Sequence, residues 1–257
     1  MTVNQKKVCF ISDAHFGIDL PGQENREQLF FRFLERESPE LSALYIIGDL
    51  FDFWIEYKQA IRPDYFLVLH HLKSLIDSGV SVHYLAGNHD FALGPFLEQI
   101  IGMSIYPGAI SCEIQGQNIY MYHGDGLQAS DFGYRLLKKI LRFPLNQQFY
   151  KLLHPAIGVP LGSLVSGSSR KYRKTFPENL FNEYRLSARR LLKKKYDIVI
   201  YGHIHYPELI RFSVGTYCNT GAWLQHNTYA LLENGTISLY RYRDGVSAET
   251  LPVQELK

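Results

Sequence analysis

Aspartate, histidine and asparagine residues gather at five separate places in the sequence, each directly after a short apolar stretch. They offer carboxylate, imidazole and amide oxygen donors without a thiolate, a set that suits Mn²⁺, Mg²⁺, Fe²⁺ or Zn²⁺. Two such ions about 3.5–4 Å apart need a bridging carboxylate, and we expect Asp49 to be that bridge. The five segments are Ser12-Asp13-Ala14-His15, Gly48-Asp49, Gly87-Asn88-His89-Asp90, His123-Gly124-Asp125 and Gly202-His203-Ile204-His205.

Each segment also has an ordinary interpretation when it is taken alone. An Asp-x-His pair is commonly a turn or a surface contact, Asn-His-Asp can form an Asx turn, and Gly-His-x-His can hold a core histidine beside a solvated one. All five occur in one chain, however, and glycine stands beside four of them, where it allows the backbone to approach an ion closely. The combination favours one metal centre.

The elements that must position these segments alternate between strands and helices. Helical spacing of apolar residues covers Arg26–Glu37 and Tyr65–Asp77, between the first three strands. The alternation indicates an α/β core, in which ligands gather beyond the carboxyl ends of the strands. The runs typical of buried strands are Val8–Ser12, Leu44–Ile47, Val82–Ala86, Ile119–His123 and Ile198–Gly202.

The second half of the chain changes in character. Asn234-Gly235 between two apolar runs is a strong hairpin signal, and a second hairpin is expected around residues 110–122. From about residue 127 to 195 the pattern is helical, basic and interrupted by prolines. Residues 134–195 carry 15 Lys and Arg against only Glu178 and Glu183, which indicates an anionic partner. We expect one domain, 1–257, with a helical basic insertion at about 127–195 that forms a cap.

Composition excludes several classes of protein. Hydrophobic residues make up 46% of the chain and charged residues 20%, as in ordinary globular proteins and unlike disordered ones. No run approaches the ~20 apolar residues of a membrane span, and the start of the chain lacks the pattern of a signal peptide. A cytoplasmic protein is therefore expected. Cys9, Cys112 and Cys218 are too few and too widely spaced for a disulfide framework.

The five segments resemble the signature of the calcineurin-like metallophosphoesterases, over roughly residues 8–15, 45–54, 85–91, 120–125 and 200–206. The resemblance implies a four-layered α-β-β-α sandwich and two divalent ions per chain, with Mn²⁺ favoured. The ligand sets that it implies are Asp13, His15, Asp49 and His205 for one ion and Asp49, Asn88, His123 and His203 for the other.

Such a site implies direct hydrolysis of a phosphate ester or pyrophosphate. The ions lower the pKa of a bridging water, and the resulting hydroxide attacks phosphorus in line with the leaving oxygen. We expect His89 to donate a hydrogen bond or proton to the transition state and Asp52 to orient His89. The alternative for Asp52 is a helix N-cap.

Within the family the chain looks most similar to the UDP-2,3-diacylglucosamine hydrolases, which form a lipid sugar 1-phosphate and UMP during lipid A synthesis. Residues 45–54, 87–94 and 123–127 carry this resemblance, together with the length and the basic insertion. One departure is His89, because the best-known branch has arginine after the ligand asparagine. The implied partner is an amphiphilic nucleotide-lipid, met on the cytoplasmic face of the inner membrane.

Candidate substrate contacts come from the core and from the insertion. Trp54 and Phe91 could stack on uracil or line an acyl pocket, or be simply core or rim residues. The amphipathic segment 135–143 is basic, which suits a membrane surface; the alternative is a solvated charged face of a cap helix. The full set of expected contacts is Asn88, His89, Trp54, Phe91, Asp131, Ser169, Arg170 and Lys174.

Two other functions remain open at this point. The same centre could act on another nucleotide, a nucleic acid or a different lipid phosphate. The cations of the insertion alternate with Leu, Ile and Phe more than with stacking platforms, which disfavours nucleic acid. A scaffold that has kept the fold and lost catalysis is a minor alternative. The sequence leaves the oligomeric state undetermined.

Overall fold

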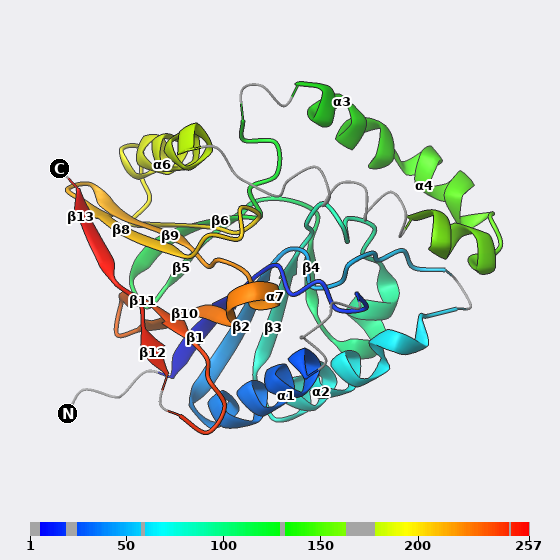
Figure 1. The fold of residues 1–257 in the computed structure, drawn as a ribbon, viewed down its shortest axis with the longest axis horizontal. Coiled ribbons are helices and arrows are strands. Elements are labelled where there is room, and N and C mark those ends of the chain that lie inside the picture. Colours follow the sequence, from blue (N-terminus) through cyan, green and yellow to red (C-terminus); the bar gives the residue numbers. More distant parts are fainter. Residues whose placement is uncertain are drawn as a thin grey trace.

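The computed structural model describes residues 6–18, 25–57, 60–128, 132–162, 178–246 and 248–256. Two β-sheets lie face to face in this part of the chain, and helices cover their outer surfaces (Figure 1). The order of layers is helix, sheet, sheet and helix, which confirms the expected α-β-β-α sandwich. Among the described helices, none combines the length and the apolar character that a membrane span requires.

The first sheet has seven strands among the described residues. In spatial order they are β12 (Glu249–Thr250), β11 (Thr236–Arg241), β10 (Thr228–Glu233), β1 (Lys7–Ile11), β2 (Leu41–Ile47), β3 (Ser81–Leu85) and β4 (Ser104–Tyr106). Strands β1 to β4 are parallel, whereas β10 pairs antiparallel with β1. Strands β10 and β11 form the hairpin that Asn234-Gly235 predicts.

The second sheet has six strands in the part of the chain that the structure describes. In spatial order they are β13 (Val253–Leu256), β8 (Glu208–Phe212), β9 (Gly215–Asn219), β7 (Ile198–Tyr201), β6 (Gln117–Tyr122) and β5 (Ile110–Ile114). Strands β6, β7 and β9 are parallel, and β5 and β6 form the second predicted hairpin. Both sheets are thus mixed, with a parallel centre that must be covered on both faces.

Within the described residues, three apolar cores hold the layers together. Helices α1 (Arg26–Glu37) and α2 (Phe66–Asp77) pack on the first sheet through residues such as Phe33 and Leu72. The sheets meet through a second core that contains Ile47 and Met121. Helix α6 (Glu178–Leu192) packs on the second sheet, where Tyr184 is buried. The helical predictions for 26–37 and 65–77 are confirmed almost to the residue.

Shorter helical elements connect the layers. Three-residue 3₁₀ turns occur at Ser38–Glu40 and Pro63–Tyr65, a π-helical turn at Phe96–Ile101, and the short helix α7 at Trp223–His226. Cys9 and Cys218 are buried and Cys112 is partly buried, all three as free thiols. The cysteines therefore serve as small interior residues.

Helices α3 (Phe132–Leu141) and α4 (Pro144–Lys151), with a further helical stretch over residues 155–162, lie beside the sandwich at the upper right of Figure 1. We call these three segments the cap helices. Helix α6 also falls in the range expected for the insertion, yet it contacts β7 and β9 of the second sheet. We therefore propose that the described part of the cap is limited to residues 132–162.

Candidate active site

The five polar segments meet at one edge of the sandwich. Strands β1, β2 and β3 of the first sheet and β6 and β7 of the second all end there, and each segment begins directly after its strand or, after β3, one residue later. The structure brings together all seven residues expected as metal ligands, and His89 and Asp52 lie beside them. The remaining candidates Asp131, Ser169, Arg170 and Lys174 lie outside the described residues.

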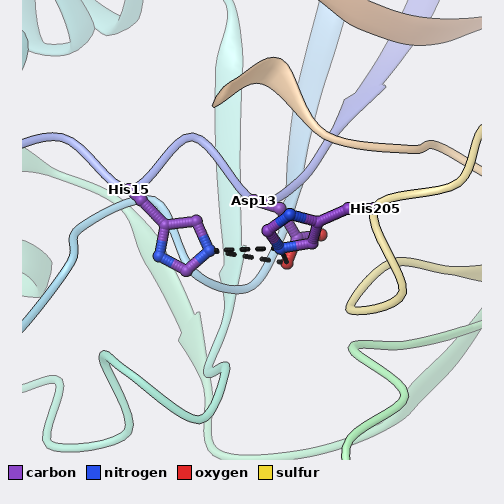
Figure 2. A group of neighbouring side chains, drawn as sticks. All are labelled: Asp13, His15 and His205. Carbon is purple, nitrogen blue, oxygen red and sulfur yellow. Dashed lines mark hydrogen bonds and ion pairs between the residues drawn. The ribbon is translucent and has the colours of Figure 1, made fainter. Parts of the chain in front are cut away.

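Asp13, His15 and His205 form the first group of ligand atoms (Figure 2). Nε2 of His205 lies 3.2 Å from Oδ1 of Asp13 and 3.4 Å from Nε2 of His15. Within the described residues, this Oδ1 atom is buried and has no hydrogen-bond partner. Leaving a buried carboxylate oxygen unsatisfied is costly, so a cation at this point fits the residues present.

Asp49, His123 and His203 form the second group, with Asn88 beside them. Nε2 of His123 lies 3.3 Å from Oδ2 of Asp49, 3.0 Å from Oδ1 of Asn88 and 3.2 Å from Nδ1 of His203. The donors are imidazole, carboxylate and amide oxygen, as in known sites for borderline cations. Four ligand atoms therefore face a common point.

Asp49 lies between the two groups. Its Oδ2 atom is 3.3 Å from Nε2 of His123 and 3.7 Å from Nε2 of His15. This is the position that a carboxylate shared by two ions must occupy. The geometry supports the bridging role expected for Asp49.

Hydrogen bonds on the far side of the rings fix which nitrogen faces each group. Nδ1 of His123 lies 2.8 Å from the carbonyl oxygen of Ile47, and a carbonyl can only accept. A proton is therefore on Nδ1, and Nε2 is the nitrogen that faces Asp49 and that can bind a cation once it is deprotonated. Gln225 on α7 orients His205 in the same way, because its Oε1 atom lies 2.9 Å from Nδ1 of His205 and can accept a hydrogen bond from it. Such partners orient metal-binding histidines.

The backbone at the site is unusual in five of the candidate ligands. Among the described residues, eight non-glycine residues have positive φ, and the other three, Gln115, Asn227 and Asn234, lie in turns or at a helix end. A non-glycine residue in this conformation costs about 1–3 kcal/mol and persists where surrounding structure imposes it, commonly at functional sites. The five are Asp13 (52°), His15 (46°), Asp49 (53°), His203 (71°) and His205 (52°).

Two glycines allow the ligand loops to approach one another. A Cβ atom on Gly87 would lie 2.1 Å from Oδ1 of Asp49, and one on Gly48 would lie 2.4 Å from Nδ1 of His123. Neither contact is possible for a larger residue without moving a candidate ligand. These two glycines therefore allow the close packing of the loops that carry the candidate ligands.

The charges of the site are strongly coupled. Burial raises the pKa of Asp49, but the imidazoles of His123, His89 and His15 outweigh burial and hold that pKa well below its usual range. Burial likewise lowers the pKa of His123, and the negative charge of Asp49 outweighs it, so that the pKa of His123 rises to about 10. Because metal-binding histidines must be deprotonated, cation binding here would release protons.

His89 is oriented mainly by a main-chain group. Its Nδ1 atom lies 2.9 Å from the carbonyl oxygen of Asp52, whereas the Asp52 carboxylate oxygen Oδ1 is 3.8 Å away. The same Oδ1 atom is 3.8 Å from Nδ1 of His15. No described helix begins at Asp52, which makes the N-cap alternative wrong. Asp52 thus lies where an orienting residue is expected, with its carbonyl as the nearer group.

Asp90 is a structural member of the site that the sequence did not single out. It is fully buried and accepts hydrogen bonds from the amides of Gly87, Asp49 and Phe51 at 2.8, 3.2 and 3.3 Å, and from the hydroxyl of Tyr84. These bonds join the loops after β2 and β3. The Asn-His-Asp sequence was the available signal, since an aspartate there can bind nearby amides.

A cavity of about 690 Å³ opens beside the candidate metal ligands. The core contributes Phe53 and Phe91, and the cap helices contribute Ile140, Leu141 and Leu161. Asn88 and His89 also border it, so the cavity adjoins the proposed catalytic group. Its size is in the range of ligand pockets.

Trp54 and Phe91 both border this cavity but differ in exposure. Trp54 is 2% exposed and stacks on Phe51 and Tyr65, with ring centroids 4.7 and 5.8 Å apart, so it is mainly a core residue. Phe91 is partly exposed and lies 5.8 Å from the guanidinium of Arg142. Of the two, Phe91 is the side chain available to a ligand.

The basic side of α3 faces the sandwich, contrary to the orientation that a membrane-binding basic face requires. Lys138 pairs with Asp125, and Arg142 donates to the carbonyl of Gly87 at 2.7 Å. Several apolar residues of the cap helices and of the turns between them face solvent instead. Those exposed by half or more are Leu136, Phe143, Leu145, Phe149, Leu152 and Ile157. Periodicity located the amphipathic helix, but could not tell which face was buried.

Comparison with known proteins extends these observations to most of the chain. The sequence model of the Calcineurin-like phosphoesterase family matches residues 6–207. The chain is 29% identical over 259 residues to UDP-2,3-diacylglucosamine hydrolase of Porphyromonas gingivalis, covering 93% of this chain and 99% of that one. It is 30% identical over 209 residues to the protein of the same name from Blochmanniella pennsylvanica, covering 79% and 80%. Among solved structures, Vacuolar Protein Sorting 29 from Cryptosporidium parvum matches over 96% of both chains, with 17% identity and a TM-score of 0.46.

Proposed function

Since this chain belongs to the calcineurin-like phosphoesterase family and is a metal-dependent hydrolase, we propose that it cleaves the pyrophosphate of UDP-2,3-diacylglucosamine to a lipid sugar 1-phosphate and UMP. Curated relatives of this name align over most of the chain. The cavity beside His89 supports the finer assignment to a lipid substrate. Its apolar wall suits acyl chains, while its border at Asn88 suits a phosphate.

The proposal includes two divalent ions, with Mn²⁺ favoured. Oxygen and imidazole donors without a thiolate are compatible with Mn²⁺. The same donors also suit Mg²⁺, Fe²⁺ and Zn²⁺. When bound, the ions would lower the pKa of water to make a nucleophile and offset the charge of the phosphate. The proposed ligands are Asp13, His15, Asp49 and His205 for one ion and Asp49, Asn88, His123 and His203 for the other.

His89 is the proposed proton or hydrogen-bond donor to the transition state. Its Nδ1 proton is held by the carbonyl of Asp52, so Nε2 is the atom that faces the site, 3.9 Å from Oδ2 of Asp49. Nε2 donates only when the ring is the imidazolium form. In that form His89 would supply positive charge where the best-known branch has arginine.

Contact with a membrane surface is proposed for the outer side of the cap helices. Leu152 is 80% exposed and Phe149 66% exposed, and clustered exposed apolar residues mark interaction surfaces. The protein should co-float with vesicles of phosphatidylethanolamine and phosphatidylglycerol. Phe149→Asp should abolish co-flotation, whereas Phe66→Asp, at an equally exposed position on α2, should not. Equal co-flotation of both variants would argue against this surface.

Action on nucleic acid is the weaker alternative. A backbone-binding groove needs cations that are free to contact phosphates. Lys138 pairs with Asp125, and Arg142 and Arg135 donate to the main-chain carbonyls of Gly87 and Gln128. In the described part of the insertion, these three cations therefore bind groups of the protein itself.

Phosphorus NMR with the Mn²⁺-reloaded protein tests the proposed substrate. UDP-2,3-diacylglucosamine, bis-p-nitrophenyl phosphate and a mixed oligonucleotide are supplied in parallel, with Asp49→Ala as the inactive control. We expect release of UMP from the first and little turnover of the other two. Hydrolysis of the generic ester alone would keep the hydrolase and discard the lipid substrate, and a salt-dependent oligonucleotide reaction would restore the nucleic-acid alternative.

A further inference from the structure

Asp125 is a buried carboxylate that the proposed chemistry does not use. It follows the candidate ligand His123 by two residues and is 1% exposed. Its Oδ2 atom lies 2.6 Å from Nζ of Lys138 and 3.8 Å from Nη2 of Arg142. Both cations belong to the cap side of the molecule, one turn apart at the end of α3. A charge from the ligand loop therefore meets two charges from the cap.

Further hydrogen bonds make Lys138 a fixed part of this contact. Its Nζ atom also donates to the hydroxyl of Tyr122 at 2.9 Å, and approaches the carbonyl oxygen of Asp125 at 3.5 Å. The Tyr122 hydroxyl in turn donates to that carbonyl at 2.6 Å. An ammonium has three donors, and all three have acceptors within reach. Such a network holds α3 in one orientation.

Arg142 extends the contact to a second ligand loop. It donates to the carbonyl of Gly87 at 2.7 Å and to that of Pro107 at 3.0 Å. Gly87 directly precedes the candidate ligand Asn88. The cap is thus tied to the loop after β6 through Asp125 and to the loop after β3 through Arg142.

The geometry points to Asp125 as the positioning residue that clamps α3 over the apolar cavity and so determines preference for a large amphiphilic substrate. Between the anchors at Lys138 and Arg142, α3 presents Ile140 and Leu141 to the cavity. Releasing the helix moves that wall, whereas the metal ligands reside on the sandwich. This inference rests on the proposed lipid substrate, because only a substrate that fills the cavity requires the cap.

Two conservative substitutions each remove one charge of the clamp while leaving the rest of the site unchanged. Asp125→Asn removes the carboxylate charge with little change of shape, and Lys138→Met removes its partner without altering the ligand loop. Lys139→Met is the matched control, since Lys139 is the exposed neighbour on the same helix. Each substitution removes the same ion pair between Asp125 and Lys138, so both test variants should free the cap.

Hydrogen–deuterium exchange of the metal-loaded protein tests the clamp without any substrate. Amides of residues 132–151 should exchange at least about tenfold faster in Asp125→Asn and Lys138→Met than in the wild type or Lys139→Met, with unchanged exchange in β1 and β2. The double variant should match either single variant, as expected for one shared interaction. Unchanged exchange in the cap would overturn the clamp, whatever the substrate is.

Kinetics then test its role in specificity. For UDP-2,3-diacylglucosamine, KM should rise by about tenfold or more in both test variants, while kcat/KM for bis-p-nitrophenyl phosphate stays within about threefold and two ions remain bound. Equal losses on both substrates, or loss of metal in both variants, would overturn the positioning role. If the wild type does not cleave the lipid, the proposed function fails, and the exchange result still decides the clamp.

Discussion

The main-chain amide of His89 donates a 2.9 Å hydrogen bond to Oδ1 of Asp49, while Nε2 of the His89 ring lies 3.9 Å from Oδ2 of the same carboxylate. One oxygen of Asp49 therefore fixes the loop that carries His89, and the other faces both groups of candidate metal ligands. The shape and the charge of Asp49 have separate tasks, which different substitutions can distinguish.

Asp49→Asn retains the oxygen that accepts from the His89 amide but removes the charge that we propose the two ions share. We expect kcat to fall by roughly 10³-fold, because preorganised charge at the reacting centre contributes on this scale. Bound metal, measured by mass spectrometry, should fall below two ions per chain. Asp77→Asn, the same change at an exposed position on α2, should alter neither. Full activity in Asp49→Asn would contradict the bridging role.

His89 and Asp52 should differ sharply in their effects on catalysis. His89→Gln should lower kcat by about 10²–10⁴-fold, the usual contribution of a general acid or base, and remove one limb of the pH–rate profile while both ions stay bound. Asp52→Asn should lower kcat by less than about tenfold, because the carbonyl that holds Nδ1 of His89 is unchanged. Equal losses in the two variants would show that the Asp52 carboxylate, rather than its carbonyl, orients the ring.

Much of this site follows from sequence because its residues stand next to strand ends. Asp49 and His123 each come directly after an apolar run or its glycine, and parallel strands carry such positions to one edge. Gln225 and Asp90 could not be assigned in the same way. Gln225 reaches His205 only through the packing of α7, and Asp90 acts through main-chain amides, which leave no mark on the residue types around it.

The cap shows a second limit of sequence analysis. Hydrophobic periodicity predicts an amphipathic segment at 135–143, which overlaps the observed helix α3, Phe132–Leu141, and by the usual rule the apolar side of such a helix faces inward. Here Lys138 faces the sandwich because Asp125 supplies a buried charge, and Leu136 is left 52% exposed. The partner of Lys138 is 13 residues away in sequence and belongs to another element. No pattern within the helix could identify it.

A substitution of Leu141 tests whether the apolar cavity binds the acyl chains of the substrate. Leu141→Asp places a carboxylate in the cavity wall, and burying that charge against an acyl chain is unfavourable. KM for the diacylated substrate, assayed in detergent micelles, should rise by about tenfold or more, the equivalent of about 1.4 kcal/mol. Turnover of bis-p-nitrophenyl phosphate should change by less than about twofold.

Leu136→Asp is the matched control, because Leu136 lies on the same helix but does not border the cavity. It should leave KM for the diacylated substrate unchanged in micelles. If Leu136→Asp raises KM as much as Leu141→Asp does, the effect comes from the outer surface of the cap helices, and the cavity is not the acyl site.

His83 connects stability to pH at a point distant from the metal ligands. Its ring stacks on Tyr45, with centroids 4.3 Å apart, and Nδ1 lies 3.1 Å from the hydroxyl of Tyr106. Burial lowers the pKa of His83, so below pH of about 6.5 the unfolded chain binds the proton more readily than the folded one. Its contribution to stability is complete above that pH and is lost as the pH falls.

Urea unfolding should therefore show a weaker decline in stability from pH 7.5 to 5.5 in His83→Gln than in the wild type. His70→Gln, at an exposed position on α2, should keep the wild-type slope, and an unchanged slope in His83→Gln would assign the acid sensitivity to other groups.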